Sequence, residues 1–212
     1  MNNTARWISE RLKEYDFIRE ARPQENTVRV VRDSHPEALI GVLSTRDVER
    51  ADARSLLEAN EGVGFVLNLP KEGRFMGDAI VLLREKRIGW GGLGDAIRAL
   101  RDCEVLGDYE ERELTFVIRG LRQHRAITDF TLLDDHRILV IRRGLPDLVI
   151  YIGSEYQPTA HSVRSAIDRF GQFDIFAATN PNSDPTVEAT EVAELGEIRV
   201  LKWRETLAAL HK

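Results

Sequence analysis

The chain carries the same succession of secondary-structure signals twice, and the two series are offset by 110 residues. At this offset TVRVV (27–31) lies over RILVI (137–141), and LIGVL (39–43) lies over VIYIG (149–153). Identical residues at paired positions include Val30 and Val140, Arg32 and Arg142, Pro36 and Pro146, Ile40 and Ile150, Ser44 and Ser154, Arg54 and Arg164, Ser55 and Ser165, and Ile88 and Ile198. Self-similarity at a fixed period is the mark of a duplicated module, although any two α/β segments share part of this rhythm.

Apolar periodicity predicts the elements of each half. In the first half we expect helices at 4–16, 46–60, 77–87 and 95–102, strands at 27–31, 38–43 and 63–69, and a short segment around Ile88. In the second half we expect helices at 111–125, 163–170, 186–195 and 204–211, and strands at 129–133, 137–141, 147–152, 173–179 and 197–203. The fold class is therefore α/β, with two similar units in tandem at 1–105 and 111–212, each a mixed sheet flanked by helices.

Composition excludes several classes of protein. No run approaches the roughly 18–20 apolar residues that span a bilayer, so no membrane partner is expected. The N-terminal sequence has no short apolar core behind a basic start, and Cys103 is the single cysteine, which together predict a cytoplasmic protein. The net charge of −5 means that any phosphate binding must come from a local basic patch.

The C-terminal sequence NPNSDPTVEATEVAELGEIRVLKWRETLAAL (180–210) resembles the end of Mrr-type proteins. The order helix, three strands, helix and strand, followed by another helix and strand, is similar to the core of the restriction-endonuclease-like fold of PD-(D/E)xK nucleases. The resemblance covers residues 111–212, and 5–102 more faintly. It implies a DNA-handling protein in which an Asp and a Glu hold Mg²⁺ and a Lys activates water.

Mapped onto this chain, the resemblance places the metal ligands at Asp147 and Glu155, with Gln157 where the Lys would stand and Glu113 as an additional ligand. The sequence argues against a complete site. Asp147 and Glu155 flank one strand, and at ~3.3 Å per residue they would lie roughly 26 Å apart. The matching segment of the first half offers only Thr45, Arg46 and Asp47. No cofactor is therefore expected, and Mg²⁺ only if the protein is a nuclease.

Basic residues form a second candidate site. Arg119, Arg122 and Arg125 lie on the polar side of a predicted helix, and a strand ends at Arg142 and Arg143. With Arg164 on the next helix, they are candidates for contacts with DNA phosphates. The alternative is a solvated face whose charge is offset by Glu110, Glu111 and Glu113.

Three other patterns in the sequence are compatible with more than one role. The segment NPNSDPT (180–186) follows a strand, where α/β sheets bind ligands, or it caps the next helix through Asp184 or Thr186. The glycines of GWGGLGD (89–95) predict a flexible loop or lid rather than a dinucleotide site, because no long strand precedes them. Ser154, His161 and Asp174 could form a hydrolytic triad, but YIGSEY is not a nucleophile elbow.

The sequence thus favours a non-catalytic binding protein of restriction-endonuclease-like type, which binds DNA or a protein partner in a nucleic-acid-handling system. Two alternatives stay open: a Mg²⁺-dependent nuclease using Glu113, Asp147 and Glu155, and a small-ligand sensor at the carboxyl edge of the sheet. The oligomeric state and the substrate are not predicted.

Overall fold

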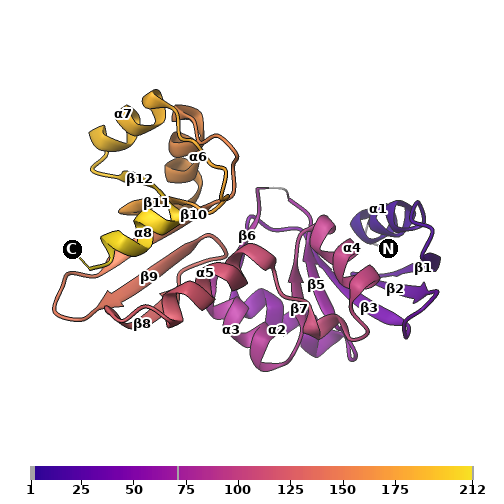
Figure 1. Cartoon of the computed structure of the whole chain (residues 1–212). Helices are drawn as coiled ribbons and strands as arrows, with labels where there is room; N and C mark the ends of the chain where they lie inside the picture. The colour runs from indigo at the N-terminus through magenta and orange to yellow at the C-terminus, as the bar shows by residue number, and fades with distance from the viewer. Residues whose placement is uncertain (1–2, 71, 212) are drawn as a thin grey trace. The chain divides into compact units, whose positions relative to one another are not determined.

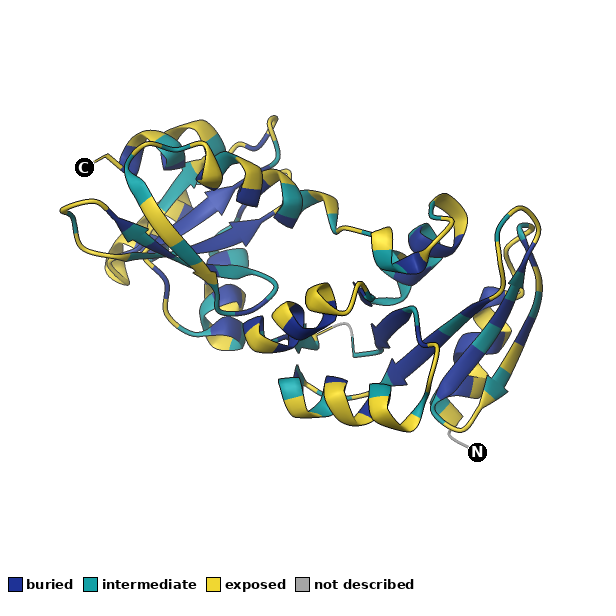
Figure 2. Cartoon of the chain, turned by 90° about the horizontal axis from the view of Figure 1, so that it is seen from below, coloured by how far each residue is buried: buried dark blue, intermediate teal, exposed yellow. Residues whose placement is uncertain are grey.

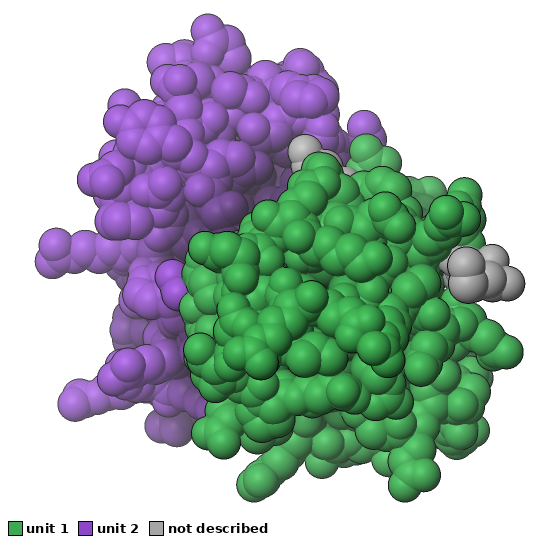
Figure 3. Space-filling model, turned by 90° about the vertical axis from the view of Figure 1, so that its right-hand side faces the viewer, with its two compact units in different colours: residues 1–111 green, residues 112–212 purple. Residues whose placement is uncertain are grey.

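The computed structural model describes residues 3–70 and 72–211, which form two compact units at residues 1–111 and 112–212. Figure 1 shows the helices and strands of both, and Figure 3 shows the division. Each unit is a mixed α/β structure with a five-stranded sheet of its own. No helix in the described ranges has the length and apolar character of a membrane span.

Unit 1 contains a sheet with the strand order β1-β2-β3-β5-β7. Its strands are β1 (Ile18–Gln24), β2 (Thr27–Arg32), β3 (Ala38–Leu43), β5 (Phe65–Asn68) and β7 (Gly89–Gly91), with a small separate pair of β4 (Asp47–Val48) and β6 (Arg74–Phe75). Its helices are α1 (Asn3–Leu12), α2 (Arg50–Ala59), α3 (Gly77–Glu85) and α4 (Leu93–Asp102), followed by the 3-10 turn η1 (Leu106–Asp108). The β1-β2-β3 meander is antiparallel, whereas β3, β5 and β7 run parallel.

Unit 2 contains a sheet with the strand order β8-β9-β10-β11-β12 and the same directions. Its strands are β8 (Ile127–Leu132), β9 (Arg137–Arg142), β10 (Leu148–Gly153), β11 (Ile175–Ala178) and β12 (Arg199–Lys202). Its helices are α5 (Arg112–Arg122), α6 (Ala160–Phe170), α7 (Val187–Leu195) and α8 (Trp203–Ala209). Thr186 caps α7, as expected for one of the two residues proposed for this role, because its hydroxyl accepts a hydrogen bond from the Ala189 amide at 3.1 Å.

The strand registers of the two units correspond residue by residue. Val30 pairs with Ala38 in unit 1, and Val140 pairs with Leu148 in unit 2, an offset of 110. The same offset relates the residue pairs between β3 and β5 to those between β10 and β11. The offset is 109 between β1 and β8, which precede the first hairpin of each unit. The register of both strands is irregular at the same place, directly after Ile18 in β1 and directly after Ile127 in β8. The difference arises because the hairpin of unit 2 has one more residue between equivalent strand partners, Leu132 and Ile138, than unit 1 has between Pro23 and Val28.

A buried arginine closes the turn after the second strand in both units. Arg32 Nε donates to the Pro36 carbonyl at 2.8 Å, and Arg142 Nε donates to the Pro146 carbonyl at 2.7 Å. Both arginine side chains are buried. A buried guanidinium is tolerated when its N–H groups find acceptors, so these arginines hold the turn in place. Arg142 therefore has a structural role and does not offer the surface charge expected of a DNA contact.

The helices of unit 2 cover the sheet in two pairs. Tyr151 on β10 and Phe176 on β11 pack with Val163 of α6 and Ala189 of α7 in one apolar cluster. The alternate residues of these strands, including Ile150, point to the opposite face, which α5 and α8 cover (Figure 1). Figure 2 shows the buried side of the helices turned toward the strands and exposed residues along their outer sides.

Three expectations for unit 1 differ from the structure. The helix expected from residue 46 begins at Arg50, because Asp47–Val48 pairs with Arg74–Phe75. β1 was missed, since IREARPQ lacks a clear apolar alternation. The glycine-rich segment is neither a loop nor a lid: Gly89 and Gly91 lie in the buried strand β7, and Gly92 caps α4. A Cβ at Gly89 would lie 2.5 Å from the Leu106 carbonyl oxygen, which explains the glycine.

Candidate functional site

The two principal carboxylates of the predicted metal site lie at opposite ends of β10. Asp147 is exposed and directly precedes the strand, whereas Glu155 is half-buried and lies two residues beyond its end. The six residues between Asp147 and Ser154 are all in the strand, which separates its ends by roughly 20 Å. The two side chains therefore cannot coordinate the same ion.

The carboxyl edge of the sheet brings Glu113 and Glu155 to a common region. The Thr179 hydroxyl contacts the Glu113 carboxylate and also donates to the Gly153 carbonyl at 3.1 Å. Glu155 folds back beside the same glycine, since a Cβ at Gly153 would lie 2.7 Å from its Oε2 atom. Gln157 is exposed two residues further along. Glu155 Oε2 and the hydroxyl of buried Ser183 have no hydrogen-bond partner within the described ranges.

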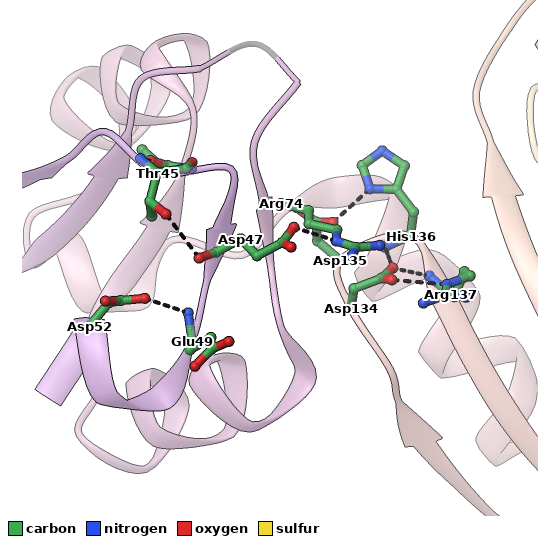
Figure 4. Close-up of polar contacts among 10 residues, drawn as sticks. Thr45, Asp47, Glu49, Asp52, Arg74, Asp134, Asp135, His136 and Arg137 are labelled. Atoms are coloured by element: carbon green, nitrogen blue, oxygen red, sulfur yellow. Dashed lines mark hydrogen bonds and ion pairs between the residues drawn. The ribbon is translucent and has the colours of Figure 1, made fainter. Parts of the chain in front are cut away.

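These donors do not fit the magnesium site that the resemblance implies. Among residues 3–70 and 72–211, no group of three or more His, Cys, Asp and Glu side chains is arranged to hold a metal ion. The corresponding segment of unit 1 uses its polar groups internally: Thr45 donates to the Asp47 carbonyl, and the Asp47 carboxylate pairs with Arg74 at 2.7 Å (Figure 4).

The residues considered for a hydrolytic triad are not brought together. Asp174 accepts a hydrogen bond from the Val149 amide at 2.6 Å, at the start of β10, whereas Ser154 follows the end of that strand. His161 lies on α6, where its Nε2 atom is 3.4 Å from the Ser165 hydroxyl. Since β10 separates Asp174 from Ser154, the three side chains form no catalytic unit.

His136 forms a polar contact that sequence reasoning did not anticipate. Its Nδ1 atom lies 2.8 Å from an Asp135 carboxylate oxygen, as Figure 4 shows, and its ring stacks on Phe170 with centroids 4.5 Å apart. Burial favours the neutral imidazole, but hydrogen bonding and charge from Asp135, with Asp134, outweigh burial and the opposing charge of Arg169. The pKa of His136 is consequently raised above its ordinary value.

The raised pKa predicts a pH-dependent contribution to stability. A raised folded-state pKa makes the stabilisation complete below the unfolded value of ~6.5, and it disappears as pH rises through the folded value. We expect His136→Gln to cost up to about 1 kcal/mol of unfolding free energy at pH 5.5, and less at pH 8.5, because the pair is partly exposed. Urea unfolding at both pH values measures the difference, and a difference that grows with pH would contradict this prediction.

Four of the predicted arginines gather where α5 ends beside β8 and β9. We call Arg119, Arg122, Arg125 and Arg143 the arginine corner; all four are exposed. The Arg143 amide donates to the Ala126 carbonyl at 2.8 Å, which holds the end of β9 against the segment that follows α5. The Arg122 guanidinium lies 6.0 Å from the ring centroid of Phe130 on β8. None of the four has an ion-pair partner within the part of the chain that is described.

The remaining two predicted arginines lie elsewhere. Arg142 is buried in the turn described above. Arg164 is exposed, but it lies on α6, which covers the face of the sheet opposite α5. The helix periodicity correctly placed the arginines of α5 on one exposed side. Arg143 belongs to the arginine corner only because strand pairing brings the end of β9 to this place.

The corresponding corner of unit 1 carries mostly the opposite charge. The offset of 109 places Arg119, Arg122 and Arg125 over Glu10, Lys13 and Asp16, and the offset of 110 places Arg143 over Asp33. The backbone is equivalent, because the Asp33 amide donates to the Phe17 carbonyl at 3.1 Å. Asp33 is also neutralised by Arg19. The same scaffold thus accepts acids at three of these four positions, so the arginines of unit 2 are not required by the fold.

Comparison with known proteins gave no match. No protein-family model, curated protein or solved structure matches this chain.

Proposed function

We propose that this chain is a duplicated α/β protein of restriction-endonuclease-like type that binds DNA through the arginine corner of unit 2 without cleaving it. The observation that carries the proposal is the group of four exposed, unpaired arginines at positions where unit 1 has three acids. Lys and Arg side chains that contact phosphates supply most non-specific DNA affinity. A local patch of this kind is compatible with the overall negative charge of the chain.

The duplication is supported by features that general α/β rhythm does not require. The two units have the same strand order, corresponding registers and the same irregularity in their first strands. Arg87 and Glu197, 110 residues apart, both have positive φ angles after the third helix of their unit. Such angles are uncommon for residues other than glycine, so their recurrence supports descent from one module.

Absence of cleavage is proposed because Asp147 and Glu155 are separated by the length of β10 and Gln157 stands where the resemblance requires a Lys. Incubation of plasmid with the protein and Mg²⁺ or Mn²⁺ tests this part. We expect intact plasmid. Cleavage that is lost in Glu155→Ala would establish the nuclease alternative instead.

DNA binding is tested by the salt dependence of the affinity. If all four arginines contact phosphates, the affinity should fall about 150-fold between 50 and 200 mM salt, and Arg122→Ala should reduce the slope by about one contact. Fluorescence anisotropy with labelled duplex DNA measures both quantities. Arg164→Ala is the matched control, since it removes an exposed arginine from the opposite side of the sheet. An affinity that does not change with salt would refute the proposal.

A further inference from the structure

An aromatic pair lies next to the arginine corner; Phe116 is its exposed member and Trp203 is half-buried. The Phe116 side chain is 50% exposed and lies on α5, three residues before Arg119. Its ring lies 5.7 Å from that of Trp203 on α8, measured between centroids, with an angle of 53° between the planes. Because residues three apart on a helix are neighbours, the Phe116 ring and the Arg119 guanidinium belong to the same surface.

The position of Trp203 depends on a glycine of α5. A Cβ at Gly120 would lie 2.6 Å from the Trp203 ring, so any larger residue would displace the indole. Gly120 also lies between Phe116 and Arg122 along the helix. The absence of a side chain at this position therefore lets two aromatic rings meet beside the arginines.

The corresponding positions of unit 1 carry different residues and make different contacts. The offset of 109 places Trp7 at the position of Phe116 and Arg11 at the position of Gly120. The Arg11 guanidinium lies 5.8 Å from the Trp7 ring centroid and pairs with Glu14 at 2.9 Å, so the ring is flanked by a paired cation. Leu93, which corresponds to Trp203, packs against the core of unit 1. The aromatic pair and the arginine corner thus occur together in unit 2 alone.

We propose that the arginine corner and the Phe116–Trp203 pair form one surface that binds single-stranded DNA in preference to duplex. This inference rests on the proposed function and specifies its ligand. Arginines that follow a phosphate backbone need only charge, which either form of DNA satisfies. The exposed Phe116 ring, with half-buried Trp203 beside it, offers stacking to unpaired bases, whereas in a duplex the base faces are already stacked within the helix. The aromatic pair therefore selects the single strand.

The experiment compares labelled oligo-dT of about 20 nucleotides with a duplex of the same length, using the full chain and the variant Phe116→Leu. Leucine keeps an apolar contact with Trp203 but removes the flat ring. We expect tighter binding of the single strand by the unaltered protein, and a loss of about 5- to 10-fold for this ligand alone in the variant. Trp7→Leu, at the corresponding position of unit 1, is the matched control and should change neither affinity.

A second readout tests the contact directly. Unlabelled oligo-dT should quench tryptophan emission, and the quenching should be lost in Trp203→Phe. Equal affinities for both forms of DNA, together with no effect of Phe116→Leu, would overturn the single-strand preference while leaving salt-dependent DNA binding intact. No binding of either form at low salt would instead overturn the proposed function and, with it, this inference.

Discussion

The triple substitution Arg119→Glu, Arg125→Asp and Arg143→Asp is expected to abolish DNA binding and leave the fold unchanged. Each new residue is the one that unit 1 carries at the corresponding position. Three phosphate contacts are lost and three repulsive charges are added, so the affinity at low salt should fall by roughly 10³-fold. The unfolding free energy should change by less than about 0.5 kcal/mol per position, because all three residues are exposed. Anisotropy titration and urea unfolding measure the two quantities.

A matched control separates the arginine corner from the net charge. Arg46→Glu, Arg54→Glu and Arg164→Glu change the charge of the chain by the same amount and involve exposed residues outside the corner. We expect this control to retain most of the affinity. If both triple variants lose binding equally, the net charge governs the interaction, and the assignment of the site to α5 and β9 is wrong.

Replacement of Arg32 by Met is expected to destabilise the protein by about 1–3 kcal/mol for each buried carbonyl that it leaves unsatisfied. The buried guanidinium donates hydrogen bonds to four backbone carbonyls, those of Pro36, Leu100, Cys103 and Glu104, at 2.7–3.1 Å. Met fills a similar volume but offers no donor, so these carbonyls must find other partners or stay unsatisfied. Urea unfolding followed by circular dichroism measures the loss, which should appear in the transition of unit 1.

Arg19→Met provides the comparison for this experiment. Arg19 pairs with Asp33 at the surface, where an ion pair contributes less than about 1 kcal/mol. A cost for Arg32→Met no greater than that for Arg19→Met would show that water replaces the guanidinium. The turn between β2 and β3 would then not depend on the buried arginine.

Most elements of the fold could be predicted from the sequence, because their apolar periodicity is local. The strand expected at 38–43 is β3 with the same bounds, and the helix expected at 186–195 is α7 to within one residue. β1, β4 and β6 were missed. β1 contains Arg, Glu and Pro, and its conformation depends on pairing with β2, which no local pattern reveals. Its partial burial likewise comes from the tertiary structure.

The candidate site was predicted in part. Periodicity placed Arg119 and Arg122 on the exposed side of one helix, which the structure also shows. Burial of Arg142 was not predictable, since arginine is usually exposed and its acceptor, the Pro146 carbonyl, is brought to it by the folded turn. Phe116 was not predicted as a site residue because it lies outside the apolar stripe of α5. Its contact with the Trp203 ring, which suggests a binding role, exists only in the folded structure.

The sequence by itself determined the order of most elements, their recurrence at 110 residues, and the separation of Asp147 from Glu155, because each depends on spacing along the chain. Only the tertiary structure decided which side chains share a surface. In the folded unit, Arg143 lies next to the end of α5, Arg164 lies on the other face of the sheet, and the Trp203 ring lies beside the Phe116 ring. The physical reason is that proximity between distant residues is fixed by strand pairing and helix packing, which spacing along the chain does not encode.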